Sequence, residues 1–330
     1  MKSIGEFDRI SRFFAPLTKN NSGAFQLTDD GGVWTPTNGY DQVVTSDCLI
    51  EGVHFFSSDK PFLLGQKLLA VNVSDLAAMG AQPQLYSLVM AYPEWVDENW
   101  MASFTDGLNV AQDRYHISLI GGDTVATPGP LTMTISAIGA VKSGQAIRRN
   151  GAKAGDDIYV SGTLGDAALA LNLEPGSLSG LAPEWVDDIM HRFLCPTARI
   201  ELGRALVGVA TSAIDVSDGL MADLGHIARA SIIHMDIRCP RLPLSLSFQR
   251  ALETDPRLID LALTGGDNYE LAFTTTKKNR RRITEIGQKL GLNITRIGTC
   301  SKQSSDADPI HALTAKGKKH LISETGYRHF

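Results

Sequence analysis

Residues 117–124, ISLIGGDT, begin as a short apolar strand and run directly into two glycines and an acid. Residues 98–115, just before them, form an amphipathic pattern that predicts a helix. Residues 131–141, just after them, alternate and are rich in threonine and isoleucine, which predicts a strand. Such alternation of helices and strands indicates an α/β chain.

The alternation continues outward from this stretch. Residues 62–80 have apolar side chains near helical spacing, and Gly80 and Pro83 are suited to end that helix. The remaining predicted elements are strands at 42–46, 85–91 and 158–161, a helix at 196–210, a basic helix at 277–286 and a surface loop at 177–183.

Length and turn residues together predict two domains. At roughly 150 residues per domain, a chain of 330 residues suggests about two. Turn-forming residues are concentrated between positions 142 and 157. We therefore expect an N-terminal domain over residues 1–145 and a C-terminal domain over residues 150–330.

Composition excludes several classes of protein. The chain is 43% hydrophobic and 20% charged, with a net charge of −5, so it is an ordinary globular chain without a global positive field for nucleic acid. Its basic run at 277–282 is interpreted as a solvated helix face. No signal peptide and no membrane-spanning apolar run are evident, and four scattered cysteines form no CxxC motif. We expect a cytoplasmic protein that binds neither nucleic acid nor membrane.

Two pairs of motifs hint at related halves. VNVSD at 71–75 resembles IDVSD at 214–218, and the GGD at 121–123 recurs at 265–267. The intervals between the paired motifs are nearly equal. Because the matches are short, a duplicated architecture stays an open alternative.

Aspartates follow or touch the apolar strand-like runs, and strand ends are where open α/β folds assemble sites. Any single one is readily explained as a helix cap or turn residue. A set that converged would need cations, and oxygen ligands without histidine or thiolate favour Mg²⁺, which shares phosphate oxygens. The pattern therefore points to a Mg²⁺–polyphosphate ligand. The acids are Asp29, Asp30, Asp47, Asp75, Asp123, Asp215 and Asp218.

The phosphate-binding parts are unconventional, because P-loop, GxGxxG, kinase HRD and DFG, and GxSxG motifs are all absent. Gly121-Gly122 and the GTLGD at 162–166 could offer backbone N–H groups to phosphate, although turns explain most such motifs. Arg148-Arg149 could pair with phosphate or be a solvated pair. His54 could be a base, a substrate donor or, as we favour from the residues alone, a satisfied buried histidine.

Motifs along nearly the whole chain carry a family resemblance. They are GEF at 5–7, Asp29-Asp30, TSDCLIEGVHF at 45–55, AVNVSDLAAMGA at 70–81, LIGGDT at 119–124, YVSGTLGD at 159–166, AIDVSDGL at 213–220, GGDNYEL at 265–271 and Gly326-Tyr327. With these motifs the chain resembles the thiamine-monophosphate kinase family, within the superfamily that includes aminoimidazole ribonucleotide synthetase and selenophosphate synthetase.

The resemblance implies two α/β domains of the aminoimidazole ribonucleotide synthetase type, with N-terminal domains that pair through their sheets in a homodimer. It implies ATP-dependent phosphorylation of thiamine monophosphate to thiamine diphosphate, by direct in-line transfer with several Mg²⁺ ions. The implied metal ligands are Asp30, Thr45, Ser46, Asp47, Asp75, Asp123, Asp215 and Asp218, of which Asp47, Asp215 and Asp218 are expected to be catalytic. The implied ATP contacts are Asp30, Gly122, Asp123, Arg149 and Ser217. The implied thiamine-phosphate contacts are His54, Asp267 and Tyr327, with Glu270 as a nearby alternative to Asp267.

The chain departs from the family at two places. Asp267-Asn268 stand where the family commonly has Glu-Asp, and Thr28 replaces a glycine before Asp29-Asp30. The rival interpretations are another enzyme of the superfamily, such as aminoimidazole ribonucleotide synthetase, and an inactive ATP-binding paralogue. A nucleic-acid binder that uses the basic run is a further rival, and it predicts salt-dependent retention on DNA.

Overall fold

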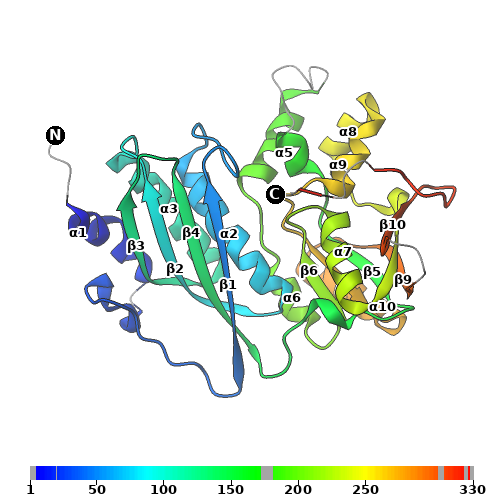
Figure 1. Cartoon of the computed structure of the whole chain (residues 1–330), viewed down its shortest axis with the longest axis horizontal. Helices are drawn as coiled ribbons and strands as arrows, with labels where there is room; N and C mark the ends of the chain where they lie inside the picture. Colours follow the sequence, from blue (N-terminus) through cyan, green and yellow to red (C-terminus); the bar gives the residue numbers. More distant parts are fainter. Residues whose placement is uncertain (1–4, 20, 172–180, 304–307, 323–325, 328–330) are drawn as a thin grey trace. The chain divides into compact units, whose positions relative to one another are not determined.

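The computed structural model describes residues 5–19, 21–171, 181–303, 308–322 and 326–327 (Figure 1). The chain divides into two compact units. Unit 1 comprises Met1–Leu76 with Ala81–Gly144, and unit 2 comprises Ala77–Gly80 with Gln145–Phe330. Each unit is built on its own sheet.

Unit 1 is a four-stranded sheet with two helices on one face (Figure 1). The strands are, in spatial order, β1 (Tyr40–Ile50), β4 (Thr132–Lys142), β2 (Gln82–Tyr92) and β3 (Ser118–Ala126). β1 and β2 both pair antiparallel with β4, whereas β3 pairs parallel with β2. The helices are α2 (Pro61–Ala78) and α3 (Glu98–Tyr115). Short helical turns at the N-terminus are α1 (Glu6–Arg9), η1 (Ile10–Phe14), η2 (Ala15–Thr18) and η3 (Ser22–Leu27).

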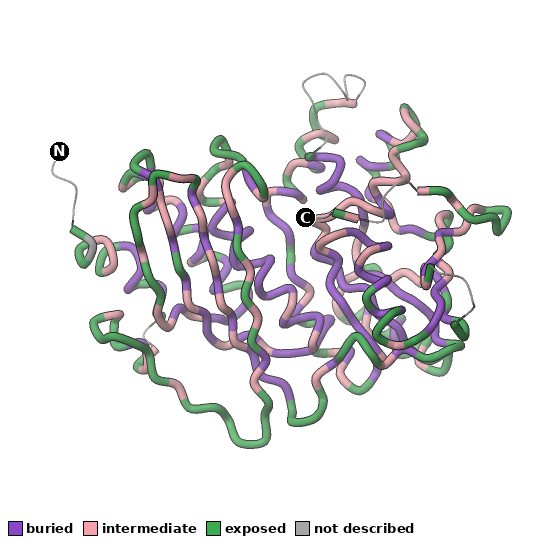
Figure 2. Tube along the Cα trace, in the orientation of Figure 1, coloured by how far each residue is buried: buried purple, intermediate pink, exposed green. Residues whose placement is uncertain are grey.

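Helix α2 is buried along almost its whole length (Figure 2), and it crosses α3 through two glycines. A Cβ atom at Gly65 would lie 2.2 Å from the Phe104 carbonyl oxygen. A Cβ atom at Gly107 would lie 2.0 Å from the Phe62 carbonyl oxygen. The absence of side chains at these positions brings the two helix backbones into contact, and this packing fixes where α2 lies under the sheet.

We expect Gly107→Ala to destabilise the protein by about 1–3 kcal/mol, because the methyl group must displace the α2 backbone. Alanine is the better helix former by about 1 kcal/mol, so a purely local effect would have the opposite sign. Urea unfolding measures the difference. The exposed neighbour Asp106, changed to alanine, is the control and should shift stability by less than about 0.5 kcal/mol. A Gly107→Ala protein as stable as the wild type would show that the helices can separate at no cost.

Unit 2 is a six-stranded sheet in the part of the chain that the structure describes. Its strands are, in spatial order, β10 (Ile310–Leu313), β7 (Ile233–Arg238), β9 (Ile294–Lys302), β5 (Asp157–Ser161), β8 (Leu271–Thr275) and β6 (Ser212–Asp215). All neighbours pair antiparallel except β10 and β7.

Helices and short turns complete unit 2. The helices are α4 (Asp166–Leu171), α5 (Pro183–Leu194), α6 (Ile200–Leu206), α7 (Leu220–Ser231), α8 (Leu246–Thr254), α9 (Ile259–Thr264) and α10 (Arg280–Leu290). The short turns are η4 (Arg149–Gly151), η5 (Cys239–Arg241), η6 (Pro256–Leu258) and η7 (Lys277–Asn279). The core includes Ile158, Val160, Leu220, Leu224 and Phe248.

The mixed α/β class is confirmed, and the helix predicted at 98–115 has the bounds of α3. Strands predicted at 42–46 and 117–120 are parts of the longer β1 and β3, and the helix predicted at 196–210 is limited to α6. The basic run at 277–282 is largely exposed, and Arg280 pairs with Asp157, as a solvated helix face predicts. The loop predicted at 177–183 lies mostly outside the described residues.

The paired motifs do not occupy equivalent elements. VNVSD lies inside α2, whereas IDVSD covers the end of β6 and the turn after it. The first GGD lies inside β3, whereas the second follows α9. The similarity of these short motifs therefore reflects their chemistry rather than a shared local structure.

Candidate active site

In unit 1, a cluster of oxygen ligands joins β1 to α2. The Thr45 hydroxyl donates to the Asp75 carboxylate. The backbone N–H of Asp47 donates to the Asn72 side-chain oxygen at 3.0 Å, and the Asn72 amide donates to the Leu68 carbonyl at 2.9 Å. Asn72 is completely buried. Asn72 is not among the predicted site residues, although its place three residues before Asp75, nearly one helical turn away, was a usable signal.

The expectation that the acids lie at strand ends is wrong for unit 1. Asp47 lies within β1, Asp75 within α2 and Asp123 within β3. Since most strands pair antiparallel, their carboxyl ends also do not meet at one edge of the sheet. Side chains therefore project from the faces of elements, and strand alternation decides which acids meet.

Strand register divides the predicted metal ligands of unit 1 into two groups. Asp47 lies in one row with Ile135, Leu88 and Gly122, and the next row is Cys48, Thr134, Val89 and Asp123. Side chains of successive rows point to opposite faces, so the Asp123 carboxylate lies on the other face from Asp47. β1 and β3 are also three strand spacings apart, about 14 Å. Two oxygen ligands of one Mg²⁺ lie at most about 4.2 Å apart, so Asp47 and Asp123 of one chain cannot share an ion.

The side chain of Ser46 is separated from its neighbours in the same way. Thr45 and Asp47 face α2, whereas Ser46 lies on the opposite face. Its hydroxyl lies 3.0 Å from the Ser136 hydroxyl and donates to the Ile135 carbonyl at 3.1 Å. The Ser46 hydroxyl therefore lies on the other face of the sheet from Thr45 and Asp47, and Ser46 could join them at an ion only through its backbone.

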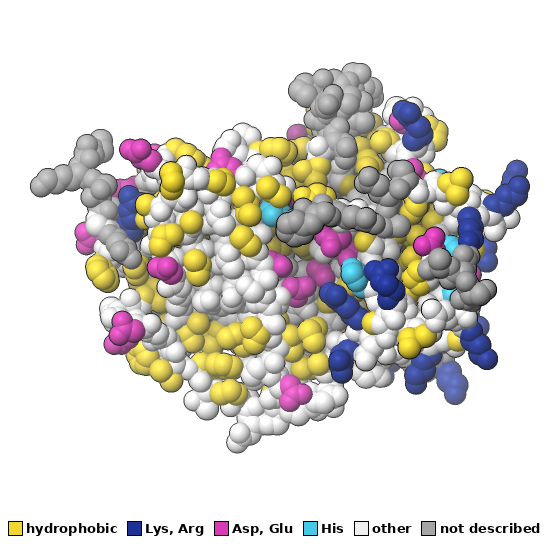
Figure 3. All heavy atoms as spheres, viewed as in Figure 1, with side chains coloured by type: hydrophobic (Ala, Val, Ile, Leu, Met, Phe, Trp, Pro, Cys, Tyr) yellow, Lys and Arg dark blue, Asp and Glu magenta, His cyan; other side chains and the backbone are white. Residues whose placement is uncertain are grey.

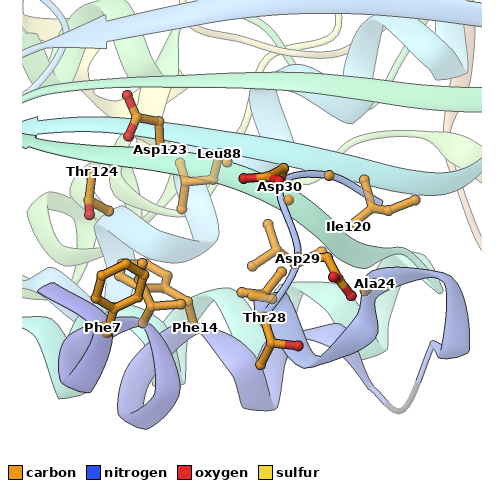
Figure 4. Close-up of a pocket in the computed structure, with 16 residues that line it drawn as sticks. Phe7, Phe14, Ala24, Thr28, Asp29, Asp30, Leu88, Ile120, Asp123 and Thr124 are labelled. Carbon is orange, nitrogen blue, oxygen red and sulfur yellow. The ribbon is translucent and has the colours of Figure 1, made fainter. Parts of the chain in front are cut away.

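A pocket of about 290 Å³ lies against the edge strand β3 and brings together Asp30, Gly122 and Asp123 (Figure 4). Asp30 and Asp123 lie toward one side of this pocket, and Phe7 and Phe14 lie toward the other. A Cβ atom at Gly122 would lie 1.9 Å from the Leu88 carbonyl oxygen. Glycine is therefore required here by the neighbouring strand, in a stretch that also lines the pocket.

In unit 2, backbone hydrogen bonds hold several predicted site residues together. The N–H of Asp267 donates to the Ser217 carbonyl at 2.8 Å, and the N–H of Tyr327 donates to the Asp218 carbonyl at 2.9 Å. Asp215 ends β6 two residues before Ser217. The motifs at 213–220, 265–271 and 326–327 thus form one site. Here the expectation of acids at a strand end is correct.

Asp223 is an acid of this site that the sequence analysis did not include. It lies in the first turn of α7, and its carboxylate accepts the N–H groups of Asp218 and Gly219, each at 3.1 Å. Burial, followed by repulsion from the nearby Asp218, raises the pKa of Asp223 to about 7. Arg149 lies close enough to lower that pKa partly. An acid four residues after Asp-Gly at the start of a helix was the available signal.

We expect Asp223→Asn to stabilise the protein at pH 8 but not at pH 5. The pKa of Asp223 is raised in the folded protein. Between about pH 4 and pH 7 the carboxyl group is therefore protonated in the folded state but ionised in the unfolded state. The contribution of Asp223 to stability falls as the pH rises through that window. Above it, the buried charge costs about 4 kcal/mol. Asparagine keeps an acceptor but leaves buried donors, so the net gain should be about 2 kcal/mol. Urea unfolding with EDTA measures it, and an equal gain at both pH values would contradict the assignment.

The departure at 267–268 has a structural explanation. The Asn268 side-chain oxygen accepts the N–H of Gly165 at 2.8 Å, and its amide donates to the Gly265 carbonyl at 2.8 Å. Asn268 therefore ties two loops together. Asp267 has a positive φ of 61°, a conformation that aspartate tolerates better than most residues, and it accepts the Tyr269 hydroxyl at 3.2 Å.

Glu270 has a different environment from Asp267. It is 3% exposed, and its carboxylate is held by the Arg199 guanidinium and by the Ser161 hydroxyl at 2.5 Å. Such a group anchors β5 and β8 to the segment before α6. The carboxylate of Glu270 is therefore engaged inside the protein, which favours Asp267 as the candidate substrate contact.

The GTLGD loop is not a phosphate cradle. The N–H groups of Gly162, Leu164 and Gly165 donate to Asn293, Pro243 and Asn268. Those donors are therefore already used inside the protein, and this expectation is wrong. Burial raises the pKa of Asp166 at the end of the loop, although it accepts the Ser245 hydroxyl at 2.5 Å.

His54 belongs to a tight turn after β1. Its Nδ1 accepts the Ile50 N–H at 3.1 Å, and its own N–H donates to the Ile50 carbonyl at 2.9 Å. The bond at Nδ1 places the proton of a neutral ring on Nε2, which makes Nε2 a donor. His54 is half-buried and satisfied on one side, in line with the interpretation that the residues alone favoured.

Comparison with known proteins identifies the class of the fold. The family described as AIR synthase related protein, N-terminal domain, matches residues 28–141. The hydrogenase maturation protein HypE in complex with ATP superposes with a TM-score of 0.76 at 18% identity, covering 98% of this chain and 96% of that one, which shows the shared fold alone. The chain thus has the fold of the AIR-synthase-related class, with acids gathered in each of its two units.

Closer relatives define the family. The thiamine-monophosphate kinase of Haemophilus influenzae is 38% identical over 331 residues, which are 99% of this chain and 98% of that protein. The thiamine-monophosphate kinase structure from Stenotrophomonas maltophilia has a TM-score of 0.83 at 38% identity and covers 97% of this chain and 98% of that one. A structure described as AaThiL complexed with AMPPCP and TMP has a TM-score of 0.78 at 30% identity and covers 90% and 89%. The chain belongs to the thiamine-monophosphate kinase family, and the prediction of a kinase is confirmed.

No helix among the described residues is long and apolar enough to cross a membrane.

Proposed function

We propose that this protein transfers the γ-phosphoryl group of ATP to thiamine monophosphate and so forms thiamine diphosphate. The observation that carries the proposal is the end-to-end likeness to thiamine-monophosphate kinases, one of which is described in complex with AMPPCP and TMP. The same likeness argues against another enzyme of the superfamily, such as aminoimidazole ribonucleotide synthetase. The departure at Asn268, which an inactive paralogue would explain, has a structural role here.

The donor groups fit Mg²⁺. Each candidate ligand offers oxygen: Asp30 and Asp123 beside β3; Thr45, the Ser46 carbonyl, Asp47 and Asp75 beside β1; and Asp215 and Asp218 in unit 2. Oxygen-only ligands suit Mg²⁺, and the distance between β1 and β3 supports the proposal of more than one ion. When bound, Mg²⁺ would neutralise the polyphosphate and the charge of the transition state. The raised pKa of Asp223 agrees with a site whose negative charge needs a cation.

Direct in-line transfer needs position and charge compensation more than a protein nucleophile. The phosphate of thiamine monophosphate is largely ionised at neutral pH, with a second pKa of about 6, so no strong base is required. Gly122, Arg149 and Ser217, with the acids beside them, would hold ATP. His54, Asp267 and Tyr327 would hold thiamine monophosphate, and the Tyr327 ring, half exposed, could stack on the cationic thiazolium.

The test measures ADP release by purified protein with ATP and Mg²⁺, with and without thiamine monophosphate, together with chromatography of the product. We expect ADP release that depends on thiamine monophosphate and stoichiometric thiamine diphosphate. Folded protein that binds ATP but forms no thiamine diphosphate would contradict the proposal. Formylglycinamidine ribonucleotide, the acceptor of aminoimidazole ribonucleotide synthetase, would then be the next substrate to assay.

We also propose a homodimer formed through the sheet of domain 1–145, with residues 150–330 as the second domain. Val44, Val89 and Val125 are 65%, 42% and 45% exposed and lie on the sheet face opposite α2 and α3. The face of unit 1 in Figure 3 carries mainly apolar and uncharged side chains. An exposed apolar face of this kind favours contact with a protein partner. A second copy of the chain could cover it by packing the same face against it around a two-fold axis. A cytoplasmic location and the lack of nucleic-acid binding stay predictions.

We expect Val44→Glu to convert the dimer into monomers, because it buries a charge in the apolar interface. Light scattering should show the mass fall by about half, whereas the exposed but distant Val110→Glu should leave the mass unchanged. A Val44→Glu protein of unchanged mass would exclude this face as the interface.

A further inference from the structure

Three potential metal ligands lie together at the edge of the sheet in unit 2. One of them, His311, lines the same pocket as Asp218 and Tyr327. His234 and Asp236 are two residues apart on β7, and His311 on β10 is directly opposite Asp236 in the parallel pair. Residues at this spacing and register point to one face of a sheet. Their neighbours Met235, Ile237, Ile310 and Ala312 belong to the hydrophobic core on the other face.

The three side chains lie close enough together to hold one ion. One ligand atom from each residue lies within 4.8 Å of the other two. His234 Nε2 is 3.2 Å from Asp236 Oδ1, and the rings of His234 and His311 have centroids 4.4 Å apart, inclined at 60°. Ligand atoms bonded at about 2.1 Å in a tetrahedron are about 3.4 Å apart. Binding one ion at that spacing would therefore require ligand atoms now within 4.8 Å of one another to move to about 3.4 Å.

We propose that His234, Asp236 and His311 form a binding site for Zn²⁺. Two imidazoles and a carboxylate are ligands that zinc prefers, whereas Mg²⁺ prefers oxygen alone. Three ligands from one face leave the fourth position to water. All three residues lie on strands of the sheet rather than in loops. His234 is only 7% exposed.

The simpler interpretation is a hydrogen-bonded His234–Asp236 pair. That pair accounts for two of the three residues, but it does not require a second imidazole from a different strand within the same 4.8 Å. A zinc ion accounts for all three. Arg238, the next residue on this face of β7, carries a positive charge that would repel a bound cation. Arg238 is exposed, so its charge is screened by solvent.

Zinc in this position would act as a clamp on the C-terminal part of the chain. β10 has four residues and is an edge strand of the described sheet, where its neighbouring strand is β7. On its other side Leu313 forms an isolated bridge with Lys319, and the Ala312 carbonyl accepts the His320 N–H at 2.8 Å. The described chain beyond it leads to Tyr327, whose N–H donates to the Asp218 carbonyl. Cross-linking β10 to β7 would stabilise this segment. The site does not depend on which phosphate acceptor the enzyme uses.

The test is a zinc titration of full-length, untagged, EDTA-stripped protein in excess Mg²⁺, which keeps the oxygen sites occupied, with a chromogenic chelator as competitor. We expect one Zn²⁺ per chain, and a loss of affinity of at least about 30-fold in His234→Asn and in His311→Asn. The matched control is His320→Asn, because His320 lies in the same C-terminal part but pairs with Asp260 at 2.6 Å. It should bind zinc like the wild type.

Two further measurements keep the proposal testable if a variant is unstable. Co²⁺ added to the wild type should give the visible absorption of a tetrahedral site, and Zn²⁺ should slow amide hydrogen exchange in residues 310–313. Zinc binding of equal strength in the His234→Asn/His311→Asn double variant would overturn the proposal. So would a wild type that binds no zinc, or one in which exchange at 310–313 is unchanged by bound zinc.

Discussion

Asp218→Asn is expected to lower kcat at least about 1,000-fold while the protein remains folded. Asp218 lies in the turn between β6 and α7, at the place where the motifs at 213–220, 265–271 and 326–327 meet. Its backbone makes the hydrogen bonds that hold this turn, so its carboxylate remains for a ligand. Removing one group that stabilises a developing charge costs about 10²–10³ in rate, and a lost metal ligand costs at least as much.

The same substitution has a second expected effect, which separates catalysis from folding. Burial is the largest cause of the raised pKa of Asp223, and repulsion from the Asp218 carboxylate is the second. Asp218→Asn removes this repulsion, so the metal-free variant should be at least as stable as the wild type above pH 7. Steady-state kinetics at saturating Mg²⁺ and urea unfolding in EDTA measure the two effects. A near-normal kcat would show that Asp218 is not a metal ligand.

Asp267→Ala is expected to raise the KM for thiamine monophosphate about 10–100-fold while the KM for ATP changes less than about twofold. A hydrogen bond to a charged group contributes about 1.5–3 kcal/mol, which corresponds to that range. Asp267 is the proposed substrate contact because the alternative acid, Glu270, is engaged with Arg199. Equal rises for both substrates would shift the substrate contact to another residue.

The backbone at Asp267 calls for two companion variants. Its φ of 61° would strain alanine by about 1 kcal/mol, so a lost loop conformation could imitate a lost contact. Asp267→Asn keeps a residue that tolerates this conformation and removes only the charge. Asp267→Glu restores the residue that is common in the family. We expect Asn to reproduce most of the rise in KM and Glu to keep a KM near that of the wild type.

Local patterns in the sequence were sufficient for the four strands and the two long helices of unit 1, but they predicted only β5, α6 and α10 in unit 2. The helix at 98–115 was predicted to the residue from its amphipathic pattern. In the structure the Asp97 side chain caps its start and His116 ends it in a left-handed conformation, and both of these are also local features. The family was also determined by the sequence, since the motifs that carry it are continuous. For the site, the sequence identified which acids to examine, and in unit 2 it placed Asp215 correctly at a strand end.

Only the tertiary structure decided how those acids are arranged. Strand pairing set the register that puts Asp47 and Asp123 on opposite faces and about 14 Å apart, and no local pattern contains that register. Contacts between distant segments made Asn268 a structural residue, gave Glu270 to Arg199 and used the N–H groups of the GTLGD loop. Burial beside Asp218 raised the pKa of Asp223. The sequence by itself determined the candidate residues, the main elements of unit 1 and the family, because these depend on neighbours along the chain. The partners of each side chain depend on neighbours in space, which only the fold provides.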